Sequence, residues 1–294
     1  EHMSESIKSD LVLNSDGSLY HINLSPGDLA ETIMLVGDPG RVKLVSSFFD
    51  DIELEKHNRE VHTITGSFNG KRMSVVSTGM GTDNIEIVIN EIDALFNIDL
   101  ETKEVKPDHT SLNLVRIGTS GGLQPDIPVR ESFLISEYSI GLDGLAYFYK
   151  DEANFIDENM TQYFINYMNW DSDFPKPYAI KGSNHLLRII GNDWRKGITL
   201  TAPGFYAPQG RELRLKLKDS TIIDRAQKFI YKNDSITNFE METSALYFLS
   251  AMLGHNALTV CSVIANRVTK EFDPDYKSSM KILVKQVIER LSKA

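Results

Sequence analysis

The sequence is poor in cysteine, in long apolar runs and in positive charge. Its one cysteine, Cys261, excludes an internal disulfide framework and a cysteine-rich zinc site. A single thiol fits a reducing compartment, and we expect a cytoplasmic protein. No apolar run approaches the ~20 residues of a transmembrane helix, and the first residues lack the charged and apolar regions of a secretory signal. No membrane partner is therefore predicted.

The charge balance limits the kinds of partner further. With 31 basic and 41 acidic side chains, the formal charge is −10. Broad nucleic-acid binding is not expected, because it needs many cations along one surface. A small anionic substrate is compatible with this balance, since a few arginines in one cleft create a local positive potential.

The 294 residues have an ordinary globular composition, with 41% hydrophobic side chains. A chain of this length buries well over half of its unfolded surface, so it needs no disulfide or structural metal to be stable. Strand-like and helix-like patterns alternate along it, with no internal repeat and no Ser/Gly-rich linker. We predict one α/β domain over residues 4–294, with a mixed central β-sheet flanked by helices. Residues 1–3 are interpreted as a cloning remnant plus the start methionine.

Apolar periodicity predicts individual elements. Strands are expected at 33–36, 61–68, 73–77, 112–117, 132–136, 197–202, 238–239 and 257–265. Helices are expected at 42–49, 85–96, 160–168, 185–191, 242–253 and 278–291. Residues 98–112 are interpreted as a surface connection, and 211–218 and 221–231 have no clear pattern. Asn69-Gly70 between two apolar runs is a strong hairpin signal, which makes the sheet mixed.

Four short segments carry side chains suited to chemistry. The first, residues 37–41 (Gly-Asp-Pro-Gly-Arg), lies between a predicted strand and a predicted helix. Glycine lets a ligand approach the backbone, free N–H groups at a helix start attract anions, and Arg41 adds a forked charge. A plain turn with a surface arginine would have the same residues. The segment is neither a Walker loop nor a dinucleotide fingerprint.

The second segment, residues 116–122 (Arg-Ile-Gly-Thr-Ser-Gly-Gly), is interpreted as a buried strand that ends in arginine and a Gly-rich turn. It places a cation, hydroxyls and backbone donors at the carboxyl end of a sheet, where open α/β sheets bind ligands. Arg116 in an apolar strand is costly unless it is paired. Its partner could be an anionic ligand or a structural salt bridge.

The third and fourth segments suit a sugar and a base. Residues 239–242 (Phe-Glu-Met-Glu) offer carboxylates to sugar hydroxyls, although the helix dipole alone also favours acidic residues at a helix start. Residues 205–211 combine Phe205, Gln209 and Arg211, and glutamine presents both a donor and an acceptor to an imide edge. A turn with exposed polar tips is the alternative there.

Three single residues carry weaker signals. His21 and Arg59 would each be surface residues by default. Cys261 lies in a buried-looking strand and is interpreted as a small hydrophobe, not a nucleophile. No spacing of histidine and carboxylate suits a metal, so no metal site is predicted.

In their order along the chain, these segments resemble the nucleoside phosphorylase family, and within it the uridine phosphorylases. The resemblance runs from residue 20 to the last helix and is weak over 98–112 and 150–180. It implies phosphorolysis of uridine to uracil and ribose 1-phosphate, with inorganic phosphate as co-substrate and no redox cofactor. It also implies a homo-oligomer, at least a dimer, whose subunits share active sites.

The resemblance implies a role for each matching residue. Phosphate would be held by Gly37, Arg41, Arg59, Arg116 and Thr119. Ribose would be held by His21, Glu240, Met241 and Glu242, and the base by Phe205, Gln209, Arg211 and Ile264. The expected catalytic residues are Arg116, Gln209, Arg211 and Glu242. His21 and Arg59 would reach the site of the neighbouring subunit.

Some positions depart from the family pattern. Asparagine precedes Arg59 where the family has histidine, which here stands one residue earlier, and the pair 207–208 is Ala-Pro instead of Pro-Gly or acidic-Gly. Some relatives bind potassium beside the segment around Glu60 and Met80. Asn84 stands where those relatives have serine, so that ion is left open.

The base is expected to be a pyrimidine. Purine-cleaving relatives carry Ser-Asp after the late buried strand, and the aspartate protonates the purine N7. Ile264-Ala265 stands there in this chain, so that acid is absent. Gln209 and Arg211 would instead stabilise charge on a departing pyrimidine. A nucleosidase, another nucleoside phosphorylase of the same fold and a non-catalytic nucleoside-binding protein stay open as alternatives.

Overall fold

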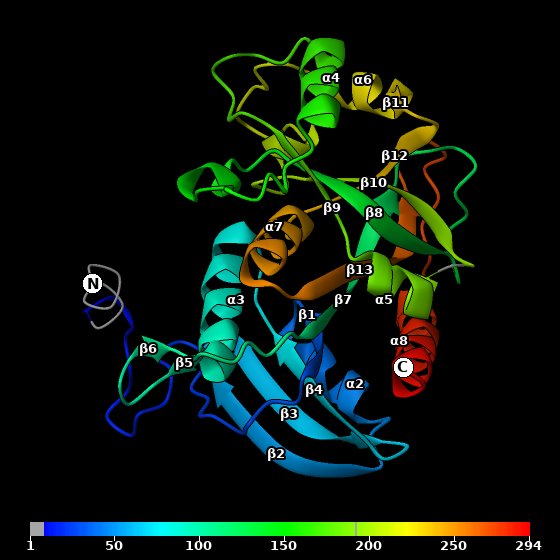
Figure 1. Ribbon diagram of the computed structural model, residues 1–294. Coiled ribbons are helices and arrows are strands. Elements are labelled where there is room, and N and C mark those ends of the chain that lie inside the picture. Colours follow the sequence, from blue (N-terminus) through cyan, green and yellow to red (C-terminus); the bar gives the residue numbers. More distant parts are fainter. Residues whose placement is uncertain (1–8, 192) are drawn as a thin grey trace.

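The computed structural model describes residues 9–191 and 193–294, and its centre is a mixed sheet of eleven strands (Figure 1). The strands of the structure are β1 Thr32–Val36, β2 Asp51–Asn58, β3 Val61–Phe68, β4 Lys71–Ser77, β5 Ile98–Asp99, β6 Glu104–Val105, β7 Asn113–Gly122, β8 Phe133–Gly141, β9 Tyr178–Lys181, β10 Arg195–Thr201, β11 Ile230–Tyr231, β12 Asp234–Glu240 and β13 Asn256–Asn266. Their order in the sheet is β11-β12-β10-β8-β13-β7-β1-β4-β3-β2, with β9 paired to β8. The short strands β5 and β6 form a separate hairpin.

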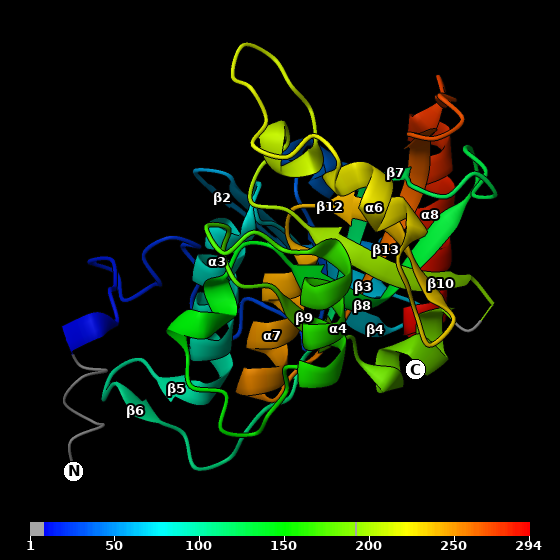
Figure 2. The same ribbon diagram turned by 90° about the horizontal axis from the view of Figure 1, so that it is seen from above.

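Helices cover both faces of the sheet. They are α2 Val42–Ser46, α3 Thr82–Asn97, α4 Glu158–Met168, α5 Asn184–Leu186, α6 Ile222–Lys228, α7 Thr243–Leu253 and α8 Tyr276–Ser292. Three 3₁₀ turns, η1 Pro39–Arg41, η2 Leu145–Phe148 and η4 Ala207–Gln209, and a π-helical turn, η3 Leu187–Gly191, complete the list. Helices α3 and α7 lie side by side on one face, as both views show (Figure 1, Figure 2).

The two faces carry separate apolar cores. Along β1, Ile33 and Leu35 pack with α3 and α7, whereas Met34 and Val36 pack with α2 and α8. All residues of β1 are buried, because parallel strands in the middle of a covered sheet have no solvent face. This explains why β1 appears in the sequence as a continuous apolar run.

One half of the sheet closes on itself, and the other half stays open. Strands β7, β13, β8, β10 and β12 pair in succession, and β12 returns to pair with β7 through Asn238–Gly122 and Phe239–Gly121. Strands β1, β4, β3 and β2 extend from β7 as an open layer, at the lower edge of Figure 1. The carboxyl ends of β1, β7, β12 and β13 meet where the two halves join.

The predicted fold class and the predicted hairpin are confirmed. Strands β3 and β4 pair antiparallel, and Asn69 (φ 47°) and Gly70 (φ 77°) form the turn between them. Two consecutive residues with positive φ match the twist of a tight hairpin, which is why Asn-Gly is favoured there. The helices predicted at 85–96, 242–253 and 278–291 correspond to α3, α7 and α8 within a few residues.

One prediction about local structure was wrong, and two further elements were not predicted. Residues 118–122 belong to β7 and are not a turn, because this Gly-rich stretch is paired with β13 and, at its end, with β12. The surface connection 98–112 contains the β5–β6 hairpin. The edge strand β2 was not predicted, because only Ile52 and Leu54 alternate with its charged residues and most of the strand is exposed.

The structure also bears on the membrane prediction. Within the two stretches that it describes, no helix is both long enough and apolar enough to cross a bilayer.

Candidate active site

A cavity of about 790 Å³ opens at the carboxyl ends of β1, β7, β12 and β13. Most of the residues predicted to form a site line it: Gly37, Arg41, Arg116, Thr119, Phe205, Gln209, Arg211, Glu240, Met241, Glu242 and Ile264. The structure therefore brings the four sequence segments to one place. His21 and Arg59 do not line this cavity.

Arg116 lies at the floor of the cavity and is only 5% exposed. Its Nη2 donates a hydrogen bond to the Glu242 carboxylate, and its Nη1 lies 3.7 Å from Oε2 of Glu240. Burial disfavours the charged guanidinium, but the two carboxylates raise the pKa of Arg116 above its ordinary value. Its Nε and Nη1 have no hydrogen-bond partner among the described residues. The salt bridges thus satisfy only part of the guanidinium, and its two unpaired nitrogens are buried.

Gly118 leaves room for the Arg116 side chain. A Cβ at position 118 would collide with Nη1 of Arg116 and lie 3.3 Å from Sγ of Cys261. Cys261 itself is buried, and burial raises the pKa of its thiol to about 11. A neutral buried thiol is a poor nucleophile, in line with its interpretation as a small hydrophobe.

The two carboxylates before α7 have different surroundings. Glu240 accepts hydrogen bonds from the N–H of Glu242 (2.8 Å), from the N–H of Thr243 (2.9 Å) and from the Thr201 hydroxyl (2.6 Å). It holds the start of α7, and burial raises the pKa of its carboxyl while Arg116 opposes this. Glu242 binds Arg116 and receives only a long contact of 3.4 Å from the N–H of Gly81. Glu242 is therefore the carboxylate with capacity left for a sugar hydroxyl.

The loop after β1 and the carboxyl-terminal part of β7 meet at the other wall. Asp38 accepts a hydrogen bond from the N–H of Gly40 (2.8 Å), which shapes the turn η1. The turn directs Arg41 across the sheet, where its Nη2 lies 3.5 Å from Oγ1 of Thr119. This approach follows from the parallel pairing of β1 with β7, which sets Leu35 beside Arg116.

The loop before and around η4 forms the opposite end of the cavity. The Arg211 guanidinium lies 4.0 Å from the centre of the Phe205 ring and donates hydrogen bonds to Phe205 O and to Oε1 of Gln209, both at 2.8 Å. Nε2 of Gln209 donates to Gly204 O at 3.2 Å. Burial lowers the pKa of Arg211. An aromatic face, an amide and a guanidinium thus lie together, and such a group can bind a flat, polar ring.

Arg267 is a cavity residue that the sequence reasoning missed. Its Nη1 donates to Gln209 O at 2.7 Å, and its guanidinium lies 5.9 Å from the Phe239 ring. Burial, and then the charge of Arg211, lowers the pKa of Arg267. Its position two residues after Ala265 was the available signal, but a lone arginine in a loop has no recognisable pattern. This end of the cavity therefore holds two neighbouring cations, Arg211 and Arg267.

His21 and Arg59 lie together on a surface outside the cavity. Nδ1 of His21 pairs with Glu91 of α3, and the His21 carbonyl accepts a hydrogen bond from Asn58 at 2.8 Å. Arg59 sits in the β2–β3 turn with φ +53°, and its guanidinium lies 5.6 Å from the Tyr20 ring. Both predicted roles would require a second subunit.

The structure also assembles one group that the sequence reasoning did not foresee. Ligand atoms of Asp93, His109 and His255 all lie within 4.8 Å of one another. Nδ1 of His255 accepts a hydrogen bond from the N–H of Leu112, so its proton is on Nε2, which donates to Asp93 at 2.7 Å. Both ring nitrogens are used, and His109 contacts Leu253 O at the end of α7. This arrangement ties the end of α7 to its neighbours.

Comparisons with known proteins agree with this geometry. The family model of the phosphorylase superfamily matches residues 31–292. A uridine phosphorylase of Thermococcus kodakarensis is 29% identical over 280 residues, covering 94% of this chain and 88% of the relative. A purine nucleoside phosphorylase of Caldanaerobacter subterraneus is 30% identical over 259 residues, covering 85% of this chain and 89% of the relative.

Among solved structures, a Trypanosoma brucei nucleoside phosphorylase that shows uridine phosphorylase activity matches with a TM-score of 0.84. It is 28% identical, and the match covers 97% of this chain and 100% of that one. The chain belongs to the phosphorylase superfamily, in its nucleoside phosphorylase family, and stands close to the uridine phosphorylases. As a member, it is a pentosyltransferase that acts on a nucleoside and phosphate. Because both uridine and purine enzymes are among its relatives, the base must be argued from the site.

Proposed function

We propose that the protein is a uridine phosphorylase, which converts uridine and phosphate to uracil and ribose 1-phosphate. The observation that carries the proposal is the base end of the cavity. Ile264 and Ala265 line the cavity together with Gln209 and Arg211, and their side chains cannot donate a proton. By the resemblance to the family, they correspond to the positions at which purine-cleaving relatives carry an acid. Donors such as Gln209 and Arg211 stabilise charge on a departing pyrimidine, which has no N7 to protonate.

Phosphate would be gathered by the free donors of Arg116, by Arg41 and by Thr119. Its oxygen attacks C1′ of the ribose, the bond from C1′ to the pyrimidine nitrogen breaks, and the bonding electron pair leaves with the base. Arg211 and Gln209 stabilise this negative charge, and the base takes up a proton from water. The contribution of the chain is positioning and electrostatic stabilisation, with no covalent intermediate and no redox cofactor.

Ribose would be held by Glu242 and Met241. Glu242 is fixed by Arg116 and keeps acceptor capacity, so it suits the sugar hydroxyls. Glu240 supports this arrangement through the start of α7 and does not need to contact the sugar. His21 would bind the ribose and Arg59 the phosphate of a neighbouring subunit, which makes a homodimer with shared sites, working in the cytoplasm, part of the proposal.

The test is product formation from uridine, thymidine, cytidine, inosine and adenosine, each with and without phosphate. We expect uracil release that depends on phosphate, with inosine and adenosine cleaved far more slowly than uridine. Inosine as the best substrate would contradict the pyrimidine assignment. Cleavage without phosphate would indicate a nucleosidase, and no cleavage at all would indicate a nucleoside-binding protein.

A further inference from the structure

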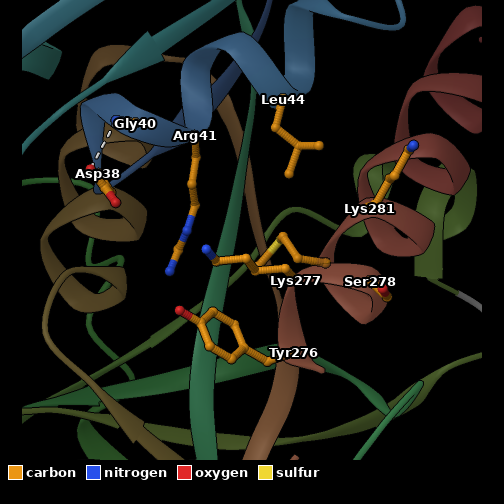
Figure 3. Close-up of a pocket in the computed structure, with 9 residues that line it drawn as sticks. Asp38, Gly40, Arg41, Leu44, Tyr276, Lys277, Ser278 and Lys281 are labelled. Atoms are coloured by element: carbon orange, nitrogen blue, oxygen red, sulfur yellow. Dashed lines mark hydrogen bonds between the residues drawn. The ribbon is translucent and has the colours of Figure 1, made fainter. Parts of the chain in front are cut away.

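A second cavity, of about 510 Å³, lies between η1 and the start of α8 and adjoins the active-site cavity. Asp38 and Arg41 line both cavities, so the two meet at the predicted phosphate end. Figure 3 shows Arg41 from η1, and Tyr276 and Lys277 from α8, pointing into this second cavity. Lys281 stands one turn further along α8 at its rim.

The cations of this second cavity lack counter-ions. Lys277 and Lys281 are exposed and form no ion pair with any residue that the structure describes. The one side-chain hydrogen bond of Arg41 is the 3.5 Å contact with Thr119. Asp38 is the single carboxylate in the lining, and one of its oxygens accepts a hydrogen bond from the N–H of Gly40. The lining therefore carries a net positive charge on a chain whose formal charge is −10.

Unpaired like charges around a hollow repel one another, and an anion between them removes that repulsion. The N-terminal end of α8, a helix of 17 residues, adds a partial positive charge on the same side. The Tyr276 hydroxyl offers a further donor. The size of the cavity and the positive charge of its lining suit an inorganic phosphate ion.

We propose that the cavity between η1 and α8 is a separate entrance for phosphate, in which Lys277 and Lys281 attract the ion and pass it to Arg41. The nucleoside would occupy the opposite end of the active-site cavity, beside Phe205 and Arg211, so phosphate reaches Arg41 without passing the base. The inference rests on the proposed phosphate-binding role of Arg41, and it adds Lys277 and Lys281 as residues that attract the phosphate before it reaches Arg41.

The test variant is Lys277→Gln/Lys281→Gln, which removes both charges and keeps the length of the side chains similar. The matched control is Lys150→Gln/Lys293→Gln, which removes the same charge from two exposed lysines that line neither cavity. Initial rates are measured with phosphate varied at saturating uridine, and with uridine varied at saturating phosphate, at low and high salt.

We expect the Lys277→Gln/Lys281→Gln variant to lower kcat/KM for phosphate about five-fold at low ionic strength, because two charges less than a Debye length from the ion are lost. Its kcat and its kcat/KM for uridine should stay within two-fold of the unmodified protein. High salt should remove most of the difference, and the control variant should show almost none. An equal fall in kcat/KM for both substrates, or an equal fall in the test and control variants, would overturn the proposal of a phosphate entrance.

A second measurement does not depend on turnover. Calorimetric titration with inorganic phosphate should show weaker binding to Lys277→Gln/Lys281→Gln than to the control variant at low salt. If phosphate-dependent cleavage of uridine occurs but both titrations agree, the entrance is wrong and the proposed function stands. If uridine is not cleaved but the titrations differ as expected, the function is wrong and the anion site stands.

Discussion

The two ends of the active-site cavity are built in different ways. At the proposed phosphate end, Arg116 and Glu242 are 5% and 6% exposed. Arg116 lies on β7 inside the sheet, and Glu242 lies at the start of α7, which packs on one face of the sheet. At the base end, Phe205 is 50% exposed, and Arg211 is held mainly by contacts within its own loop. Strands held on both sides keep charged groups in place before the substrate binds, whereas a loop can change without disturbing the sheet. This difference agrees with the proposal that phosphate binds at the first end and the base at the second.

The largest effect is expected from Arg116→Met, which leaves Glu242 and Glu240 buried beside no cation. Breaking a buried pair in this way should lower the free energy of unfolding by about 3 to 5 kcal/mol and the turnover of uridine about 10³-fold. Urea unfolding and initial rates measure the two effects.

Arg195→Met serves as the control for this variant, because the pair of Arg195 with Asp126 (2.7 Å) is largely exposed. Its loss should cost about 1 kcal/mol or less and leave turnover unchanged. Similar unfolding curves for the two variants would show that the phosphate end is not the more rigid part.

Arg211→Ala removes a charged donor from the base end. Uridine turnover should fall about 10²-fold, or about 3 kcal/mol, while the unfolding midpoint changes little because the arginine sits on a loop. Arg214→Ala, an exposed arginine in the same stretch, is the control and should behave like the unmodified protein. Unchanged turnover of uridine by Arg211→Ala would remove this arginine from base recognition.

Arg41→Ala sharpens the comparison from the phosphate side. The Arg41 guanidinium contacts Thr119 and makes no hydrogen bond to the loop that holds Phe205 and Arg211. The KM for phosphate should therefore rise about ten-fold, and the KM for uridine should rise much less. Both constants come from initial rates with one substrate varied at a time. A rise of the same size in both would make Arg41 a structural residue.

A mixed dimer tests whether the partner completes the phosphate end. Arg59→Ala and Glu242→Ala should each be inactive alone. If Arg59 serves the neighbouring site, each mixed dimer holds one site with both changes and one with neither, and random exchange at equal amounts restores about a quarter of full activity.

Exchange of subunits must be established for this test by co-expression or mild dissociation, with mixed dimers identified by mass. Inactive mixed dimers would place Arg59 and Glu242 in the same subunit's site.

The smallest effect is expected at Cys261, which packs against the rigid end beside Gly118. Because burial raises the pKa of its thiol to about 11, iodoacetamide should label the folded protein far more slowly than the urea-unfolded chain. Cys261→Ala should cost about 1 kcal/mol and keep turnover within two-fold. Rapid labelling that abolishes activity would contradict a purely packing role.

Local patterns predicted most of the core elements. Apolar spacing located α3, α7 and α8, and Asn69-Gly70 located the β3–β4 hairpin, because both signals come from residues close together in the chain. The edge strand β2 gave only a weak signal, from Ile52 and Leu54, since an edge strand needs only backbone pairing on one side and can stay largely charged. The glycines that end β7 resembled a turn until their pairing partners were known.

The sequence by itself determined the fold class, and it marked the four segments that meet at the cavity, with residue types suited to an anion, a sugar and a base. Only the tertiary structure decided which of those residues pair with one another and which are left to contact a ligand. Arg116 and Glu242 are 126 residues apart, so their pairing depends on the register of β7 against its neighbours and on where α7 begins. The same register turns Glu240 back to cap α7 and brings Arg267 beside Arg211. Sequence patterns report local periodicity, whereas charge pairing over such separations is set by how the strands align and how the helices pack upon them.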